Sequence, residues 1–536
     1  MQRFFNLIKS IKFLRTIQLR DRITRKFRKF RFYKKINHMG ARCNLSEKMY
    51  KDSQILIDST HLKFGTFWVE LEGIGEKYHD KSDLLLLYKL NYLDHLNSIS
   101  LSDSQRYDIL NNWISKSKDL NCPTWDPFPS SVRAVNILRL GSYKNYESIL
   151  WLHYLIIDQF IEKHLLANHY LTNLKALYIL SQLFNTSKKN VFRDDLIKQL
   201  HEQFAIDGVY YEQSTGYQRQ LHLDLLDLFN FSSSGDYYDA TLSNICLKLI
   251  QKSDDFLNEI NDDTVFNDFL SDFSPTKEDL RCYQKKLLGS NDKIDVSREK
   301  LRHFPVSKFT FAEKRDVRVA CSAGKILCNY NPGHQHANFA SIEIWINRKK
   351  IITNSVSSTY ATNAQRLRER GASYNNSLLI NGREIYKIFD SFKLANRPVV
   401  EQDAAKLNDF FLIQNSLIMN NFPWIRKRKI NRDLALYCDG LRICDSSSRK
   451  SDIVNSYFNL MPGFNIEKEN DNILFISDGE LAFELIFDGH FFEDTIDIGV
   501  GYKRTQLTKQ LCFTGYGYVS VSIKIKGEKI EYSCRE

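Results

Sequence analysis

The sequence contains no apolar run near the roughly 18 residues that a membrane-spanning helix needs. Its ten cysteines include no CxxC pair and no zinc-ribbon spacing. Scattered single thiols favour a reducing compartment over a disulfide framework. Glycine (22) and proline (9) are scarce, and there is neither a long low-complexity tract nor an internal repeat. A chain of 536 residues with this globular composition predicts two or three folded domains.

A secretory signal is also missing. Residues 1–35 carry thirteen Lys/Arg and one Asp, and these charges interrupt the apolar residues, with no small-residue cleavage site behind them. We therefore expect a cytoplasmic location.

The rest of the chain is close to neutral although the net charge of the whole chain is +11. A basic patch within the folded body is expected of a nucleic-acid-binding protein, so we expect no nucleic-acid partner.

The basic N-terminal segment shows helical spacing of its apolar residues, which are Phe4, Leu7, Ile8, Ile11 and Leu14. One interpretation is a basic amphipathic helix within residues 1–35 that contacts an anionic membrane surface. The other is a helix packed on the next domain with its cations solvated. Both stay open on sequence alone.

The hydrophobic period changes along the chain. From about residue 84 to 290, apolar residues recur at i, i+3, i+4 and i+7, including an unbroken run over 148–184, which predicts an all-α array of helical hairpins. After about residue 300 the period is two, which predicts an antiparallel β-sandwich. The sequence therefore predicts a basic segment (1–50), a helical domain (51–298) and a β domain (299–536).

Two histidines, His334 and His336, precede one of the alternating runs and are two residues apart. Residues i and i+2 of a strand point to the same face. Two imidazoles on one face are consistent with a metal site, with acid/base chemistry, or with hydrogen bonds that hold a loop.

Five stretches in order resemble the heparinase II/III-like polysaccharide lyases and their relatives in bacterial polysaccharide gene clusters. They are WDPFPSSVRAVNILRL, HLLANHYLTNLKAL, DGVYYEQSTGY, GHQHANFASIEIWINRKKIITNSVSSTY and RERGASYNNSLLING. The resemblance covers roughly residues 50–400. It implies an α + β multidomain fold, an incomplete (α/α) toroid followed by an antiparallel β-sandwich, and β-elimination at a uronic acid.

In such a reaction the site neutralises the uronate carboxylate, removes the neighbouring proton and protonates the leaving oxygen. The resemblance assigns the first task to Asn168 and His169, which otherwise fit a capped helix start or a core histidine. Tyr217 matches the catalytic tyrosine as acid or base, and His334 matches a base or substrate contact. Glu212 is expected to orient this loop or to contact substrate.

The sequence departs from the family pattern at several positions. Gln218 and Asn338 stand where histidine and aspartate are usual. His336 aligns with a ligand of the family's structural zinc, but Asn354 and Asn375 replace the other two ligands. Asparagine amides are poor zinc ligands. We therefore expect no tightly bound zinc and no other cofactor, with His336 hydrogen-bonded inside the sheet.

Three further residues are expected to bind substrate. Arg366 and Arg370 lie where the family has arginines, and a guanidinium grips a carboxylate with two hydrogen bonds. A solvated charge run is the alternative for both arginines. Tyr360 is expected to reach the same cleft.

Two functional hypotheses follow. The first is a lyase that cleaves a uronate-containing acidic polysaccharide by β-elimination. The second is a non-catalytic glycan-binding or assembly protein of surface-polysaccharide biosynthesis that descends from such lyases, which the four departures favour. Because such lyases usually act outside the cytoplasm, the cell envelope or periplasm is the alternative location. The oligomeric state stays open.

Overall fold

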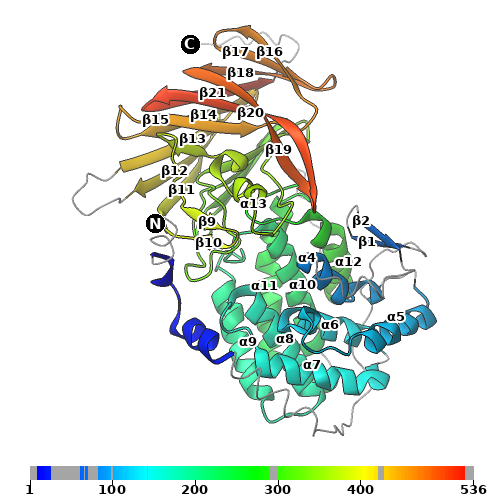
Figure 1. Ribbon diagram of the computed structural model, residues 1–536. Helices are drawn as coiled ribbons and strands as arrows, with labels where there is room; N and C mark the ends of the chain where they lie inside the picture. Colours follow the sequence, from blue (N-terminus) through cyan, green and yellow to red (C-terminus); the bar gives the residue numbers. More distant parts are fainter. Residues whose placement is uncertain are drawn as a thin grey trace.

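The computed structural model describes residues 9–25, 61–64, 67–70, 83–97, 101–141, 143–233, 235–289, 299–419 and 428–525. Within these ranges helices dominate up to Leu288, and antiparallel strands dominate from Glu299 onward. Figure 1 shows the helical half below the stacked β layers. The predicted α + β class, helices followed by antiparallel sheets, is confirmed. One short antiparallel pair, β1 and β2, precedes the helices (His61–Phe64 and Phe67–Glu70).

The helical half consists, in its described residues, of a series of neighbouring antiparallel helices. They are α4 (Leu84–Asn91), α5 (Asp103–Lys116), α6 (Pro127–Arg139), α7 (Glu147–Phe160), α8 (Ala167–Leu183), α9 (Lys189–Gln203), α10 (Thr215–Ser232), α11 (Ala240–Glu259) and α12 (Lys277–Leu288). Helix α8 is at the centre and packs on α6, α7, α9 and α10. It is buried on nearly every side, as an interior helix requires.

Helix starts follow from local sequence. Ser102 and Thr276 form capping boxes with Gln105 and Asp279, and Pro127 opens α6, where its missing N–H costs nothing. The apolar run over 148–184 forms two helices, α7 and α8, although its helical period is unbroken. It breaks between Phe160 and Ala167, where no glycine or proline marks the break.

In its described residues, the β half consists of three larger sheets and the small pair β9–β10. A five-stranded sheet runs in order β3-β4-β5-β6-β7, an eight-stranded sheet β11-β12-β13-β14-β21-β18-β17-β16, and a four-stranded sheet β19-β20-β15-β8. The strands are β3 (Glu299–Phe304), β4 (Phe309–Lys314), β5 (Val317–Ser322), β6 (Ser341–Ile346), β7 (Lys349–Ile352), β8 (Leu378–Ile380), β9 (Ile388–Asp390), β10 (Lys393–Leu394), β11 (Val399–Lys406), β12 (Phe411–Met419), β13 (Arg428–Leu436), β14 (Gly440–Ser447), β15 (Ile453–Asn459), β16 (Asn465–Asn470), β17 (Ile473–Ser477), β18 (Ala482–Asp488), β19 (His490–Gly501), β20 (Arg504–Tyr516) and β21 (Tyr518–Ile525). A short helix, α13 (Ala364–Glu369), lies between β7 and β8.

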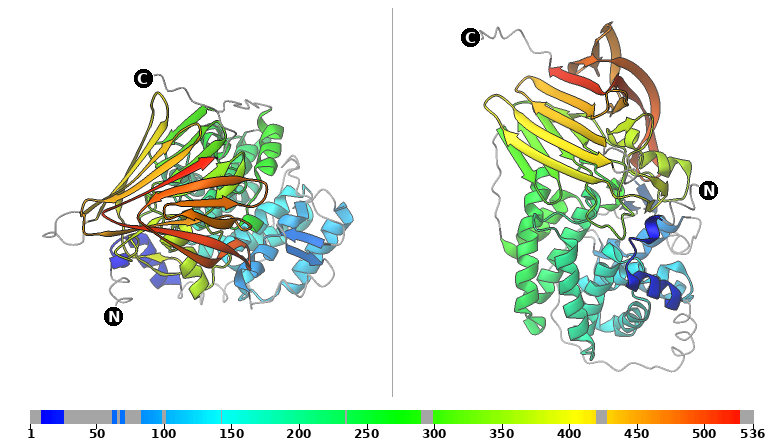
Figure 2. Two further views of the ribbon diagram at one scale, coloured as in Figure 1. Left: turned by 90° about the horizontal axis from the view of Figure 1, so that it is seen from above. Right: turned by 90° about the vertical axis from the view of Figure 1, so that its left-hand side faces the viewer.

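The five-stranded sheet is a middle layer that is buried on both faces. On β4, Phe309 and Phe311 belong to the helical core, whereas Ala312 belongs to the core shared with the eight-stranded sheet. Phe256 of α11 meets Phe309 edge to face at 5.2 Å between ring centroids. Alternating side chains of one strand therefore join the two halves of the chain. Figure 2 shows the strands layered on the helices from two more directions.

The described part of the basic N-terminal segment, residues 9–25, is helical over 9–11 and 16–25. Phe4, Leu7 and Ile8 of the predicted amphipathic face lie outside the described residues. Within the described chain, no helix combines the length and the apolar character that crossing a membrane requires.

Candidate active site

Tyr217 lies in the first turn of α10. Ser214 caps this helix, and its Oγ accepts a hydrogen bond from the Tyr217 backbone N–H (3.1 Å). The same hydroxyl donates to the backbone carbonyl of Asp268. Capping by Ser is a local sequence effect, but the second bond is tertiary. Together they fix Tyr217 against the segment that leads into the β half.

His334 comes from the loop between β5 and β6, and its ring stacks on Tyr217. The ring centroids are 3.9 Å apart and the ring planes differ by 16°. His334 is mostly buried, with about a tenth of its side chain exposed. Two residues that are 117 positions apart in the sequence are thus held face to face at the junction of the helical and β halves.

Glu212 orients the His334 ring. Its Oε2 lies 2.8 Å from His334 Nδ1 and also accepts a hydrogen bond from the Tyr210 hydroxyl at 3.0 Å. A carboxylate can only accept, so Nδ1 carries the hydrogen and Nε2 of the neutral imidazole has the free lone pair. This arrangement suits a general base that acts through Nε2. Glu212 thus pairs with His334, whereas the sequence led us to expect it to orient its own loop or to contact substrate.

Tyr360 adds a second phenol to the stack. Its hydroxyl is 3.4 Å from that of Tyr217, and its ring lies under the Arg366 guanidinium at 4.8 Å. Burial raises the pKa of Tyr217 well above the ordinary value, although the hydrogen bond with Tyr360 acts in the opposite direction. Burial likewise raises the pKa of Tyr360. Both phenols are therefore protonated at neutral pH and able to donate.

Asn168 and His169 lie in the first turn of α8, after two residues with left-handed φ, Leu166 (59°) and Ala167 (51°). His169 Nδ1 is 3.1 Å from Glu162 Oε2. Burial favours the neutral imidazole, but the neighbouring Glu162 carboxylate outweighs it and raises the pKa of His169. The Asn168 side chain is buried and has no hydrogen-bond partner in the described chain.

A chain of contacts joins the two pairs of residues. The Gln203 amide donates to the Ala167 carbonyl (3.0 Å) at the start of α8 and lies 3.5 Å from the Tyr210 hydroxyl. Tyr210 in turn bonds Glu212, the partner of His334. On the opposite side, the Asn331 amide donates to the Leu165 carbonyl at 3.0 Å. The structure thus brings Asn168 and His169 to the region of Tyr217 and His334.

The two predicted substrate-binding arginines are placed differently from expectation. Arg366 and Arg370 are fully buried. Arg366 makes a bidentate ion pair with Asp268 (2.5 and 2.6 Å), and Arg370 donates to the carbonyls of Asp390 (2.7 Å) and Gln335 (2.6 Å). Neither a substrate contact nor a solvated charge run describes them. They hold the loops that carry Tyr360 and His334.

His336 is part of the same buried ion pair. Its Nε2 is 2.8 Å from Asp268 Oδ1, and its Nδ1 is 2.9 Å from Asn375 Oδ1. The pKa of His336 is lowered by burial, against the pull of Asp268. With both ring nitrogens engaged and the Arg366 cation on the same carboxylate, the donor set does not fit a zinc ion.

The other residues that depart from the family pattern make hydrogen bonds inside the protein. The Asn354 amide donates to the Val265 carbonyl at 2.8 Å. Gln218 accepts from the Tyr210 backbone N–H at 2.6 Å and donates to Ser253 Oγ at 2.8 Å. Asn338 donates to the Asn267 side chain at 2.9 Å. All three amides therefore hold backbone or side chains inside the protein.

Sequence reasoning missed Glu162 and Asp268, which control His169 and Arg366. Glu162 is hidden inside the apolar run over 148–184, because only the break in that run turns it toward His169. Asp268 is in a segment without regular structure, between α11 and α12. The signal for Glu162 was a charge at an interior position of an otherwise apolar helical pattern.

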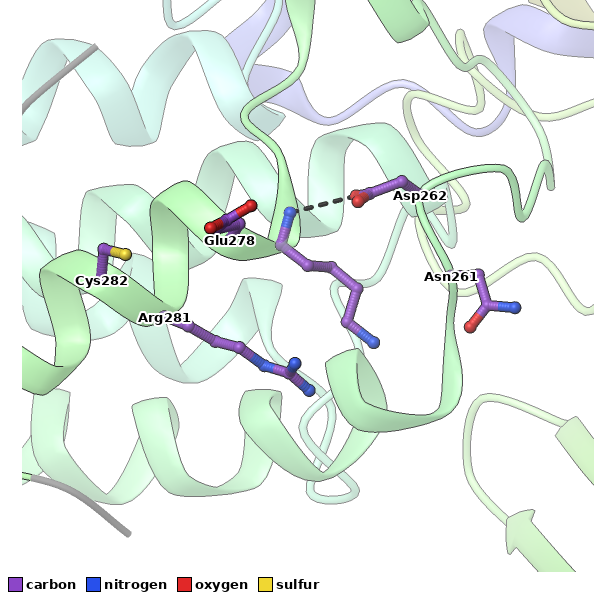
Figure 3. A pocket seen from close by; sticks show the side chains of 6 residues that line it. Asn261, Asp262, Glu278, Arg281 and Cys282 are labelled. Carbon is purple, nitrogen blue, oxygen red and sulfur yellow. Dashed lines mark hydrogen bonds between the residues drawn. The ribbon is translucent and has the colours of Figure 1, made fainter. Parts of the chain in front are cut away.

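A separate pocket of about 500 Å³ lies where α11 ends and α12 begins (Figure 3); it is lined by Asn261, Asp262, Lys277, Glu278, Arg281 and Cys282. Lys277 donates from Nζ to the Ile260 carbonyl at 2.5 Å. Arg281 donates to the Asn258 side chain at 3.2 Å. Lys277 thus satisfies a carbonyl at the carboxyl end of α11, where positive charge is favourable. The pocket includes none of the site residues described above.

Comparison with known proteins identifies the β half. Residues 297–531 match the family model described as heparinase II/III-like, C-terminal. No curated protein sequence matches the chain. The resemblance seen in the sequence motifs is thereby confirmed.

Solved structures share the whole architecture. The structure of heparinase III superposes with a TM-score of 0.61 at 13% identity, over 84% of this chain and 78% of that one. The heparan sulfate lyase HepC from Pedobacter heparinus gives 0.56 at 11% identity, over 95% and 89%. The chondroitin AC lyase of Streptomyces coelicolor A3, solved with chondroitin sulphate, gives 0.50 at 10% identity, over 83% and 75%. These likenesses confirm the toroid-plus-sandwich fold.

Proposed function

Since residues 297–531 form a heparinase II/III-like C-terminal domain, we propose that the chain is a polysaccharide lyase that cleaves a uronate-containing acidic polysaccharide by β-elimination. One observation carries the proposal. His334 is stacked on Tyr217 while its Nδ1 is paired with Glu212, which leaves Nε2 ready to take a proton beside a phenol that is ready to give one.

The geometry supports the following roles. The Asn168 amide and the protonated His169 bind the substrate carboxylate, which stabilises the enolate-like intermediate that forms when the adjacent proton leaves. Preorganised donors of this kind contribute about 3–4 kcal/mol each in oxyanion holes. His334 Nε2 removes the proton. Tyr217, kept protonated by burial, gives its hydrogen to the departing sugar oxygen, and Tyr360 is placed to hydrogen-bond the resulting phenolate.

The structural neighbours support the substrate class. The names of these neighbours refer to heparan sulfate and chondroitin sulphate. Both are acidic polysaccharides, and a site that pairs a free amide with an imidazolium suits a uronate of either kind. We therefore propose an acidic polysaccharide as the partner of this chain, without a bound metal or other cofactor.

The alternative function is a non-catalytic glycan-binding or assembly protein. The observation that favours it is the loss of the zinc-ligand set, with Asn354 and Asn375 in place of two ligands. Such a protein would keep the affinity for acidic glycans without turnover.

The test is absorbance from unsaturated uronyl ends while the full chain is incubated with a panel of uronate polysaccharides. A positioned acid contributes about 10²–10⁴-fold, so Tyr217→Phe is expected to lower kcat by at least about 100-fold. The matched control is Tyr516→Phe, since Tyr516 is 74% exposed in the β half. Binding without absorbance across the panel would replace the lyase by the glycan-binding alternative.

A further inference from the structure

The N-terminal segment, residues 9–25, is docked beside the proposed site. Gln18 and Asp21 on its inner face are buried. The Asp21 carboxylate accepts hydrogen bonds from the backbone N–H of His164 (3.0 Å) and from its ring Nδ1 (3.1 Å). His164 lies in the connection that leads into Asn168 and His169. The segment therefore contacts the same loop that places the carboxylate-binding pair.

A second anchor links the segment to the β half. Arg15 forms an ion pair with Glu202 of α9, and its guanidinium lies 3.9 Å from the centre of the Tyr330 ring. The Tyr330 hydroxyl donates to Glu202 at 2.9 Å. Tyr330 is four residues before His334. In Figure 1 this segment, in dark blue, lies between α9 and the pair β9–β10. The N-terminal segment thus contacts both halves of the chain on the side where the proposed site lies.

One cation on the docked side of this segment makes no ion pair with the part of the chain that the structure describes. Arg25 is four residues after Asp21 and is half-buried, with Nη1 3.0 Å from His164 Nδ1. Asp21, the one acidic residue among 9–25, bonds His164. No carboxylate of the described residues pairs with Arg25. Its charge acts against the protonation of His169 and helps to lower the pKa of Glu162, the carboxylate that bonds His169. Arg25 therefore lies within electrostatic range of the pair that is proposed to bind the substrate carboxylate.

We propose that residues 9–25 form part of the polysaccharide site and that Arg25 binds an acidic group of the sugar next to the one held by Asn168 and His169. This inference rests on the proposed function. A guanidinium binds a carboxylate or a sulfate through two parallel hydrogen bonds. An acidic group there is attracted both to Arg25 and to the protonated His169. In this proposal, the positive charge of the N-terminal segment serves substrate binding.

An anionic membrane is the competing partner for this segment, because Ile23 (68%) and Leu19 (41%) are exposed on it. The position of Arg25 favours the glycan. It is half-buried on the side of the helix that contacts His164, whereas a flat bilayer would meet the exposed side of the helix that carries Ile23 and Leu19.

The experiment measures polymer affinity of the full chain by calorimetry in the Tyr217→Phe background, so that substrate is not consumed. The probes are alginate, which carries carboxylates alone, and chondroitin sulfate, which adds sulfates. Arg25→Gln is compared with Arg22→Gln, which removes an exposed cation three residues earlier. We expect Arg25→Gln to raise Kd about tenfold, from the strength of hydrogen bonds to charged groups. Arg22→Gln is expected to change it less than about twofold, and Arg25→Lys to fall between the two.

The outcomes separate the claims. Equal affinity of Arg25→Gln and Arg22→Gln overturns the role of Arg25. Weaker binding to vesicles that contain phosphatidylglycerol, with unchanged polymer affinity, overturns it in favour of a membrane surface. If the unmutated chain binds the polymer but forms no unsaturated product, only the lyase proposal is overturned. The comparison of polymer affinity between Arg25→Gln and Arg22→Gln still decides the role of Arg25. Absence of any polymer binding by the unmutated chain overturns both.

Discussion

At the scale of single residues, the proposed chemistry depends on which carboxylate faces which imidazole. Glu212 bonds the nitrogen of His334 that points away from the reaction and leaves the other free. Glu162 instead raises the pKa of His169, so that this ring is the positive one. In the proposed chemistry the two histidines therefore take opposite roles, His334 as base and His169 as cation.

Glu162→Gln is expected to lower the pKa of His169. In the unmutated chain that pKa is raised, so the imidazolium persists to higher pH. Without the carboxylate, the charged form is lost at lower pH, and affinity for a polyuronate should decline at lower pH than in the unmutated chain. The measurement is an NMR titration of the His169 ring, assigned with His169→Gln, alongside binding as a function of pH. Glu278→Gln on α12 is the control, and an unchanged titration in Glu162→Gln would refute the assignment.

His336 gives a prediction about metal. Because its two nitrogens face Asp268 and Asn375, we expect purified protein to contain far less than one zinc per chain. Treatment with EDTA is expected to leave Tm unchanged. His336→Gln should lower Tm without altering metal content, since it removes hydrogen bonds and no ligand. One zinc per chain that is lost in His336→Gln would show that the family site is still occupied.

At the scale of elements, the start of α8 has a backbone conformation that the sequence did not predict. Left-handed φ at Leu166 and Ala167 costs of order 1–3 kcal/mol for such residues. Contacts from far in the chain hold this conformation, among them the bonds of Gln203 and Asn331 to the carbonyls of Ala167 and Leu165. A local apolar period carries no information on such contacts. The break between α7 and α8 is therefore not visible in the period.

The buried ion pair of Asp268 and Arg366 joins three such segments, because His336 and Ser357 also contact Asp268. Breaking a buried pair from one side costs about 3–5 kcal/mol. We expect Asp268→Asn to destabilise the fold by that order in chemical unfolding. Asp471→Asn, at an exposed pair with Lys468 (94% exposed carboxylate), is expected to have an effect below about 0.5 kcal/mol. Equal stability of the two variants would contradict the prediction.

The same ion pair sets a pH dependence. The Arg366 guanidinium and the His336 hydrogen bond outweigh burial and hold the pKa of Asp268 well below its usual range. A depressed carboxyl pKa contributes stability that is complete above the unfolded value, near 3.9, and declines as the pH falls below it. Unfolding curves between pH 3 and 6 should therefore show a smaller acid loss in Asp268→Asn than in the unmutated chain.

At the scale of the whole molecule, periodicity predicted the order of helices and strands because each half buries one face of its elements. Motif order predicted the family, and it named the residues that meet at the junction. It did not predict that Arg366 and Arg370 turn inward, since a charged residue on a polar stretch looks the same whether its partner is a substrate or Asp268. Nor did it show that one layer of β-strands is buried on both sides.

The shared middle layer predicts that the two halves unfold together. Phe309 and Phe311 complete the helical core, and Asp207 in the helical half accepts hydrogen bonds from Val306 N–H (3.0 Å), Ser307 N–H (2.8 Å) and Ser307 Oγ (3.0 Å). We expect the helical circular dichroism signal and the near-ultraviolet signal to change at one Tm. Asp207→Ala should lower both midpoints equally, since it strands two backbone donors at about 1–3 kcal/mol each, whereas Asp409→Ala at an exposed position should not. Two separate midpoints in the unmutated chain would mean that the interface couples the unfolding of the two halves less strongly than its packing implies. The proposed site would then be able to open between the halves.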